Sequence, residues 1–145
     1  MATVKDILAA KGSEVYTVDV DAPIRTALQI LADKKIGALP VMANGHIAGI
    51  FSERDFARYA ATAMDPCADV RVRDLMVSPV YFVSPDQTLD DCMAVMTAKK
   101  LRHLPVIQDD VLVGVVSIGD VVKVVIDEKQ NTIKDLEHFL WVNMI

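Results

Sequence analysis

The sequence predicts an α+β fold built from two tandem repeats, and three observations support this prediction. Shifting the chain by 65 residues aligns residues 18–59 with residues 83–124 without a gap, and an internal repeat of this kind sets the whole architecture. Each copy carries its elements in the order β-α-β-β-α. A copy of about 60 residues is only marginally stable alone. We therefore expect the two copies to pack face to face about a pseudo-two-fold axis.

The first copy shows the local signals of this order. Residues 16–20 are rich in β-forming side chains and end in Asp, Ala and Pro, which predicts a short strand. Residues 23–36 predict a helix, because their apolar side chains recur at helical spacing. Asn44-Gly45 predicts a hairpin between two strands, because both residue types tolerate the positive φ of a type I′ turn. A second helix is expected over residues 55–63.

The second copy repeats these signals in a weaker form. Residues 80–83 predict the short strand, Asp109-Asp110 occupies the hairpin turn, and residues 120–126 predict the last helix. The apolar stripe of the intervening helix consists of Leu89, Cys92, Met93 and Met96.

The segments outside the aligned copies divide the chain. Val4–Leu8 resembles Val72–Met76 at a slightly different offset. The copies join around residues 61–71, where Asp65-Pro66 breaks the helical pattern. We therefore place the first repeat at residues 4–64, the second at residues 72–130 and a C-terminal helix at residues 131–145.

The C-terminal segment predicts an amphipathic helix that begins with a capping-box pattern at Thr132. Its apolar stripe has to be covered by the core or by a second subunit, and we expect a homodimer with two-fold symmetry. The stripe consists of Ile133, Leu136, Leu140 and Trp141.

Composition excludes several classes of protein. With 52% hydrophobic residues the chain has enough apolar surface to fold, so disorder is excluded. Charges interrupt every apolar run before the roughly 18 residues that a membrane helix needs, and the N-terminus lacks the layout of a signal peptide. The net charge of −5 argues against nucleic acid and anionic membranes as partners. The two cysteines, Cys67 and Cys92, fit a reducing compartment, so we expect a soluble cytoplasmic protein.

The motif Gly-x-x-Ser-x-x-Asp occurs in both copies, as Gly49–Asp55 and Gly114–Asp120, each time where a strand becomes a helix. Ser followed three residues later by Asp forms a helix-capping box, and this purely structural interpretation stays open. Recurrence of the whole motif in both copies favours a ligand site. A helix N-terminus attracts anions such as phosphate, and the Asp carboxylate can accept hydrogen bonds from a pair of ribose hydroxyls. The glycine lets another group approach the backbone closely.

With Leu-Pro-Val at residues 39–41 and 104–106, the hairpin and this motif, the chain resembles a tandem pair of CBS domains, the Bateman module, over roughly Val4 to Asp127. The resemblance implies a regulatory sensor of adenosine ligands such as AMP, ADP, ATP, NAD(H) or S-adenosylmethionine, bound in clefts between the repeats. The short form is similar to small bacterial CBS-pair proteins of signal transduction. A regulated protein partner is implied but not identified.

The resemblance also implies which residues line the two clefts, with aliphatic side chains such as Ile36 and Leu101 covering the adenine faces. The Asp120 cleft would consist of Ser117, Gly119 and Asp120 facing Lys11, Tyr16, Ile36, Gly37 and Ala38. The Asp55 cleft would consist of Ser52, Arg54 and Asp55 facing Met76, Pro79, Tyr81, Leu101, Arg102 and His103.

The clefts differ at two pairs of positions. Glu53-Arg54 in one copy corresponds to Ile118-Gly119 in the other, and Gly37-Ala38 corresponds to Arg102-His103. Arginine offers fixed donors to phosphate oxygens, so we expect the Asp55 cleft to hold phosphates more strongly. The basic run at residues 99–103 is interpreted as a solvated helix end beside this phosphate subsite.

Two other classes of function stay open. An enzyme acting on nucleotides is disfavoured, because the chain shows no nucleophile with a base, no glycine-rich P-loop and no set of metal ligands among its histidines and cysteines. A structural or dimerisation protein with non-functional clefts is disfavoured by the intact Ser and Asp in both copies. We therefore expect no catalytic residue, no catalytic cofactor and no metal.

Overall fold

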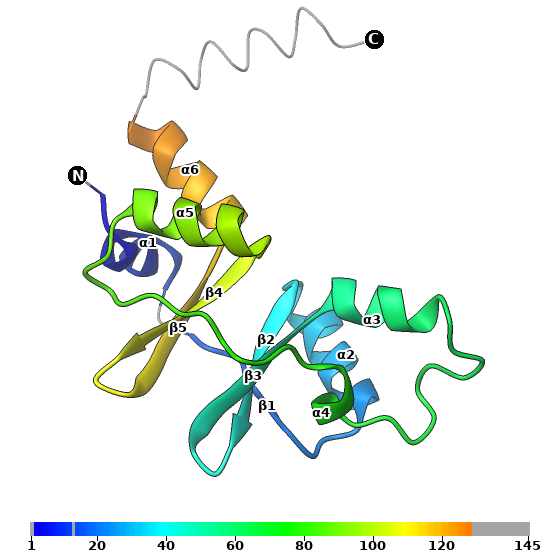
Figure 1. The fold of residues 1–145 in the computed structure, drawn as a ribbon. Coiled ribbons are helices and arrows are strands. Elements are labelled where there is room, and N and C mark those ends of the chain that lie inside the picture. The colour runs from blue at the N-terminus through cyan, green and yellow to red at the C-terminus, as the bar shows by residue number, and fades with distance from the viewer. Residues whose placement is uncertain (1, 13, 129–145) are drawn as a thin grey trace, which may run out of the picture.

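The computed structural model describes residues 2–12 and 14–128, so the predicted C-terminal helix and its apolar stripe lie outside the described residues. Two repeats of mixed helix and strand lie side by side, with the strands toward the middle of the molecule (Figure 1). The first repeat consists of α1 (Val4–Lys11), β1 (Val18–Asp19), α2 (Ile24–Lys34), β2 (Ala38–Ala43), β3 (His46–Ser52) and α3 (Glu53–Ala60). The second consists of α4 (Val72–Leu75), α5 (Leu89–Lys99), β4 (His103–Gln108), β5 (Val111–Ser117) and α6 (Ile118–Glu128).

The two hairpins have the same register, which confirms the predicted internal repeat. Strand β1 pairs in parallel with β2, β2 pairs antiparallel with β3, and β4 pairs antiparallel with β5. Both hairpin turns have positive φ at both central residues, as a type I′ turn requires, with 52° and 81° at Asn44 and Gly45 and 51° and 65° at Asp109 and Asp110. Aspartate therefore adopts the left-handed conformation that the asparagine–glycine pair adopts in the first copy.

The predicted strand at residues 80–83 is wrong, because only a single parallel bridge from Val83 to Val106 is formed. In the first copy the Val20 N–H donates to the Met42 carbonyl at 2.9 Å and extends the pairing. The residue at the equivalent position is Pro85, which has no N–H to donate.

The helices follow the predictions with small shifts. Helices α3 and α6 begin two residues earlier than predicted, directly after Ser52 and Ser117. On α5, Leu89, Cys92 and Met96 are buried, whereas Met93 is 39% exposed, so it does not belong to the buried stripe.

The leading helix of each repeat packs on the opposite repeat. Helix α1 contacts β5 and α6, and its Val4 and Ile7 belong to the core of the second repeat. Helix α4 contacts β3 and α3, and its Val72 belongs to the core of the first repeat. Figure 1 shows α1 beside α5 and α6, and α4 beside α2 in the first repeat. The two repeats are therefore interlocked, which goes beyond the face-to-face packing expected from the sequence.

Each core is a cluster of aliphatic side chains between a hairpin and its helices. The first contains Phe51, the largest fully buried side chain, with Ile24, Leu31 and Leu39, and the second contains Leu104, Val106, Val116 and Val121. Phe51 and Val116 belong to these cores and directly precede Ser52 and Ser117, the strand-to-helix junctions from which the candidate site is built.

Candidate functional site

Both Ser-x-x-Asp motifs form complete capping boxes. The Ser52 N–H donates to Asp55 Oδ2 at 3.0 Å, and the Asp55 N–H donates to Ser52 Oγ at 3.3 Å. The equivalent bonds of Ser117 and Asp120 are 2.9 and 3.1 Å long. The structural interpretation of the motif is therefore correct. The bonds to each carboxylate use its Oδ2 atom, so the Oδ1 atom lies outside the box.

The motif glycines let other groups approach the backbone closely, but these groups belong to the chain itself. A Cβ atom on Gly49 would lie 2.7 Å from the Met76 Sδ atom and 3.0 Å from the Val77 carbonyl oxygen. A Cβ atom on Gly114 would lie 2.5 Å from the Leu8 Cδ2 atom. The two glycines thus admit the leading helices α1 and α4 onto the opposite repeat. The expectation that they serve a ligand is corrected for Gly49, which does not line the cavity of its motif.

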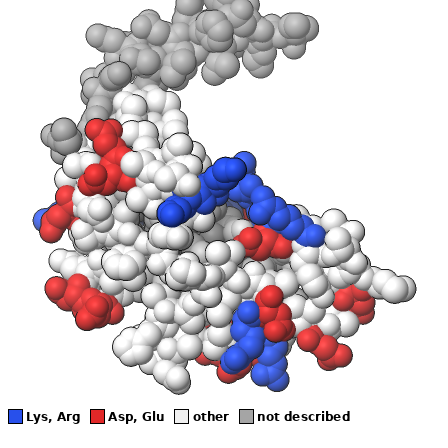
Figure 2. All heavy atoms as spheres, viewed as in Figure 1, with Lys and Arg blue, Asp and Glu red and all other residues white. Residues whose placement is uncertain are grey.

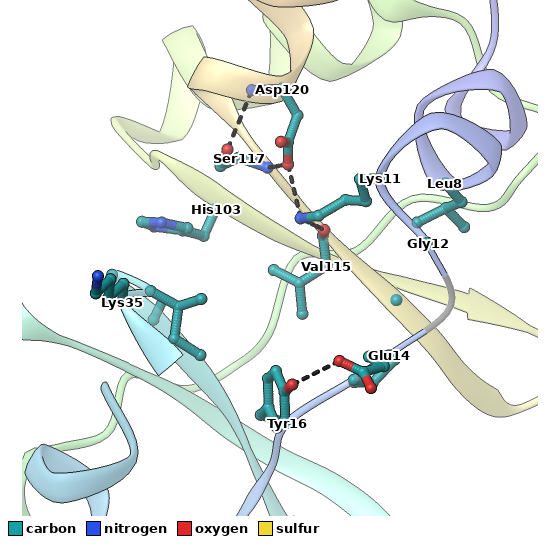
Figure 3. Close-up of a pocket in the computed structure, with 15 residues that line it drawn as sticks. Leu8, Lys11, Gly12, Glu14, Tyr16, Lys35, His103, Val115, Ser117 and Asp120 are labelled. Atoms are coloured by element: carbon teal, nitrogen blue, oxygen red, sulfur yellow. Dashed lines mark hydrogen bonds and ion pairs between the residues drawn. The ribbon is translucent and has the colours of Figure 1, made fainter. Parts of the chain in front are cut away.

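A cavity of about 400 Å³ lies at the Asp120 motif, between the two repeats (Figure 3). Seven of the eight residues predicted for the Asp120 cleft line it: Lys11, Tyr16, Ile36, Gly37, Ala38, Ser117 and Asp120. His103, which was assigned to the Asp55 cleft, also lines it. Residues that sequence reasoning did not assign to either cleft contribute as well, namely Leu8, Gly12, Glu14, Val15, Lys35, Gly114 and Val115. Several of these residues belong to α1 and to the segment after it. Their position depends on the packing of α1 against the second repeat.

The carboxylate of Asp120 is paired inside this cavity. The Lys11 ammonium donates to Asp120 Oδ2 at 2.8 Å and to the Val115 carbonyl at 2.7 Å, as Figure 3 shows. Burial raises the pKa of Asp120, but the bonds from Lys11 and from the Ser117 N–H lower it more, so the net pKa lies below its ordinary value. This carboxylate is ionised at neutral pH and already holds one cation.

Tyr16 closes the other side of the Asp120 cavity. Its hydroxyl donates to Glu14 Oε2 at 2.6 Å, and the Lys34 Nζ lies 5.0 Å from the centre of its ring. The hydrogen bond to the Glu14 carboxylate is the main cause that raises the pKa of Tyr16, so the phenol stays neutral. The aromatic ring of Tyr16 and the aliphatic side chain of Ile36 both line this cavity.

A second cavity of about 400 Å³ lies at the Asp55 motif. Six of the nine residues predicted for the Asp55 cleft line it: Ser52, Arg54, Asp55, Leu101, Arg102 and His103. Ile50, Glu53, Arg58, Val77, Lys99 and Lys100 complete it, together with Gly37 and Ala38 from the first repeat's β2 region.

Five cationic side chains line the Asp55 cavity, whereas Lys11 and Lys35 are the cations of the Asp120 cavity. On the face of the molecule shown in Figure 2, Lys and Arg side chains form a band across the middle, with acidic side chains below it. The five are Arg54, Arg58, Lys99, Lys100 and Arg102. Arg58 was missed, although its i+4 spacing from Arg54 places both on one face of α3.

Four predicted residues lie outside the two cavities, for separate physical reasons. The side chain of Met76 packs on Gly49 and joins the core of the first repeat. Tyr81 is 43% exposed, and its ring lies 5.0 Å from the Lys99 Nζ atom. Pro79 is exposed in the segment after α4, and Gly119 is exposed in the first turn of α6 with no side chain to reach the cavity.

Other groups offer less chemistry. Within residues 2–12 and 14–128, no three His, Cys, Asp or Glu side chains gather as a metal ion would require. Both cysteines are free; Cys92 is buried, and burial raises the pKa of its thiol. Among the described helices, none combines the length and the apolar character needed to cross a bilayer.

Comparison with known proteins identifies related chains. The CBS domain family matches residues 4–62 and 72–127. The solved structure of a protein with CBS domains from Burkholderia ambifaria MC40-6 is 42% identical, with a TM-score of 0.83 over 87% of this chain and 95% of that chain.

Two solved structures with bound ligands share the fold at 24% identity, each covering 88% of this chain and 98% of the other. One is CBSX2 in complex with AMP, with a TM-score of 0.74. The other is the CBS domain pair of the protein MJ0100 in complex with 5′-methylthioadenosine and S-adenosyl-L-methionine, with a TM-score of 0.78.

Proposed function

The chain belongs to the CBS domain family, and from this premise we propose that it is a non-enzymatic regulatory module that binds adenine nucleotides in the Asp55 and Asp120 clefts. CBS pairs related to it bind adenosine ligands, as the complexes with AMP and with S-adenosyl-L-methionine illustrate. The observation that carries the proposal is the pair of matching cavities, each with a helix N-terminus and an Asp carboxylate at its wall.

The lining of each cavity suits the three parts of a nucleotide. Ile36 and Leu101 offer apolar walls to adenine, one in each cavity. The Oδ1 atoms of Asp55 and Asp120 lie outside the capping boxes and can accept bonds from ribose hydroxyls. The first turns of α3 and α6 favour an anionic phosphate group.

Binding would regulate by biasing the relative orientation of the two repeats. Residues from both repeats line each cavity, so a ligand held there binds one orientation more tightly than another. A protein partner in the same reducing compartment would then respond to this change. This role needs no catalytic group, and we propose none.

Calorimetric titration with AMP, ATP, NADH and S-adenosylmethionine tests the proposed function. We expect saturable binding of at least one of them, with adenosine itself also bound. Mass spectrometry of the denatured purified protein provides a second readout, because a tightly held nucleotide would be released. If no adenosine ligand binds and none is released, the alternative of a structural interaction protein with non-functional clefts is supported instead.

We further propose that the chain is a homodimer. On α6, Ile118 and Val122 are 48% and 49% exposed and lie one helical turn apart, and Met93 on α5 is also exposed. Apolar helix faces of this kind are covered in a stable assembly. Light scattering at micromolar concentration should give twice the chain mass of 15.9 kDa, with and without nucleotide. A mass equal to that of one chain in both conditions would contradict the dimer.

A further inference from the structure

His103 lies in the wall between the two cavities and lines both of them, together with Gly37 and Ala38. It is the first residue of β4 and is paired with Ser117, the capping serine of the Asp120 motif. Figure 3 shows its ring between the Ser117–Asp120 segment and Lys35. The imidazole is therefore positioned to face a ligand in either cleft.

Gly37 provides the space for this ring. A Cβ atom on Gly37 would lie only 3.2 Å from the Cε1 and Nε2 atoms of His103. The internal repeat offers no second copy of this arrangement, because the residue equivalent to His103 is Ala38 and the residue equivalent to Gly37 is Arg102. A single imidazole thus lines both cavities.

Charges from both clefts surround the imidazole. Burial lowers its pKa most, and the Lys11 ammonium of α1 and the Arg102 guanidinium lower it further. The Asp120 carboxylate of α6 and the Glu53 carboxylate of α3 act in the opposite direction. Because the net pKa lies below the ordinary value of 6.5, the ring is neutral at neutral pH and takes up a proton only at lower pH.

We propose that His103 couples the two clefts, so that an anionic ligand in one strengthens binding of an anionic ligand in the other through a proton held on the shared imidazole. This inference rests on the proposed nucleotide binding. A phosphate beside the ring favours the imidazolium form. The positive charge then attracts a phosphate in the opposite cleft, and the coupling is reciprocal by linkage.

The coupling depends on pH in a defined direction. Near pH 6 binding of the first ligand is accompanied by protonation of His103, so the second ligand binds beside an imidazolium. Near pH 8 the ring stays neutral with or without ligand, so the favourable coupling is lost and the two phosphates repel each other. The second equivalent of ADP should therefore bind about fivefold or more tightly relative to the first at pH 6 than at pH 8, within the usual range of coupling between sites.

Proton NMR of the histidine Cε1–H signals tests the coupling on the wild-type chain. The signal of His103 is identified by its loss in His103→Gln, which separates it from those of His46 and His138. Adding ADP should move the titration midpoint of His103 to higher pH. Calorimetry in buffers of different ionisation enthalpy should show more proton uptake for the wild type than for His103→Gln; the titration of ADP itself contributes equally to both and cancels.

Arg102→Gln is the matched control, because Arg102 precedes His103 in the chain but lines only the Asp55 cavity. It should weaken binding in that cleft and keep the ligand-dependent shift of the His103 midpoint. If ADP binds and the His103 midpoint does not move, the coupling is overturned while the proposed function stands. If ADP and the other nucleotides do not bind at all, both are overturned.

Discussion

Replacing Asp55 by alanine is expected to weaken nucleotide and adenosine binding in the Asp55 cleft by about 10- to 100-fold, and Asp120→Ala should do the same in the Asp120 cleft. Each change removes a charged acceptor for the ribose hydroxyls, and hydrogen bonds to charged groups contribute about 1.5–3 kcal/mol. The same changes break a capping box, which lowers the free energy of unfolding by about 1 kcal/mol. Calorimetric titration and thermal unfolding measure the two effects separately.

Asp91→Ala is the matched control for loss of the cap. Thr88 and Asp91 form a capping box of the same geometry at the start of α5, with bonds of 3.0 and 3.1 Å, and neither residue lines a described cavity. Asp55→Ala and Asp91→Ala should therefore lose similar stability, and Asp120→Ala should lose more because it also breaks the ion pair with Lys11. Only Asp55→Ala and Asp120→Ala should lose affinity. If these two variants lose stability alone, capping is the whole role of the motif.

Arg54→Ala is expected to reduce the affinity of the Asp55 cleft for ATP by about 10- to 100-fold and its affinity for adenosine much less. Arg54 lies in the first turn of α3, where its donors and the helix dipole act together on a phosphate group. Losing one charged donor costs about 1.5–3 kcal/mol of binding free energy. Glu53 lines the same cavity and offsets part of the positive charge, which leaves the five cations in excess over Glu53 and Asp55.

The salt dependence of ATP binding distinguishes a phosphate contact of Arg54 from a role in supporting the fold. Removing a cation that contacts phosphate should make the affinity for ATP less sensitive to ionic strength, because screening then has less attraction to weaken. Arg25→Ala, at an exposed position of α2 outside both cavities, should change neither quantity. Equal losses for adenosine and ATP in Arg54→Ala would show that Arg54 supports the cleft without contacting phosphate.

Sequence patterns predicted the hairpins, the helices and most of each cavity because these features are local or repeated. The Asn-Gly turn, the Ser-x-x-Asp junctions and Leu-Pro-Val each favour a particular local conformation. Because the sequence repeats at an offset of 65 residues, the same elements are predicted in the second copy. Thirteen of the seventeen residues assigned to the clefts line the two cavities. Whether they bind a nucleotide is a proposal that the titrations test.

Sequence reasoning failed where a side chain had two possible partners. Met76 was assigned to a cleft, but its thioether fills the space beside Gly49. Tyr81 was assigned to the same cleft, but its ring lies beside the Lys99 ammonium at 43% exposure. In both cases the residue type suited either environment, and only packing between segments distant in the chain selects one.

The sequence by itself determined the two repeats, their strands and helices, and the two capping motifs that line the cavities, because short-range spacing and turn chemistry encode them. The tertiary structure alone decided that α1 packs on the second repeat and α4 on the first, that the Lys11 ammonium hydrogen-bonds Asp120 Oδ2, and that the His103 ring lies against Gly37. These arrangements depend on which apolar helix face fills which core and on the space beside Gly37, Gly49 and Gly114. Close packing between segments distant in the chain determines these arrangements, and no local pattern of residues predicts that packing.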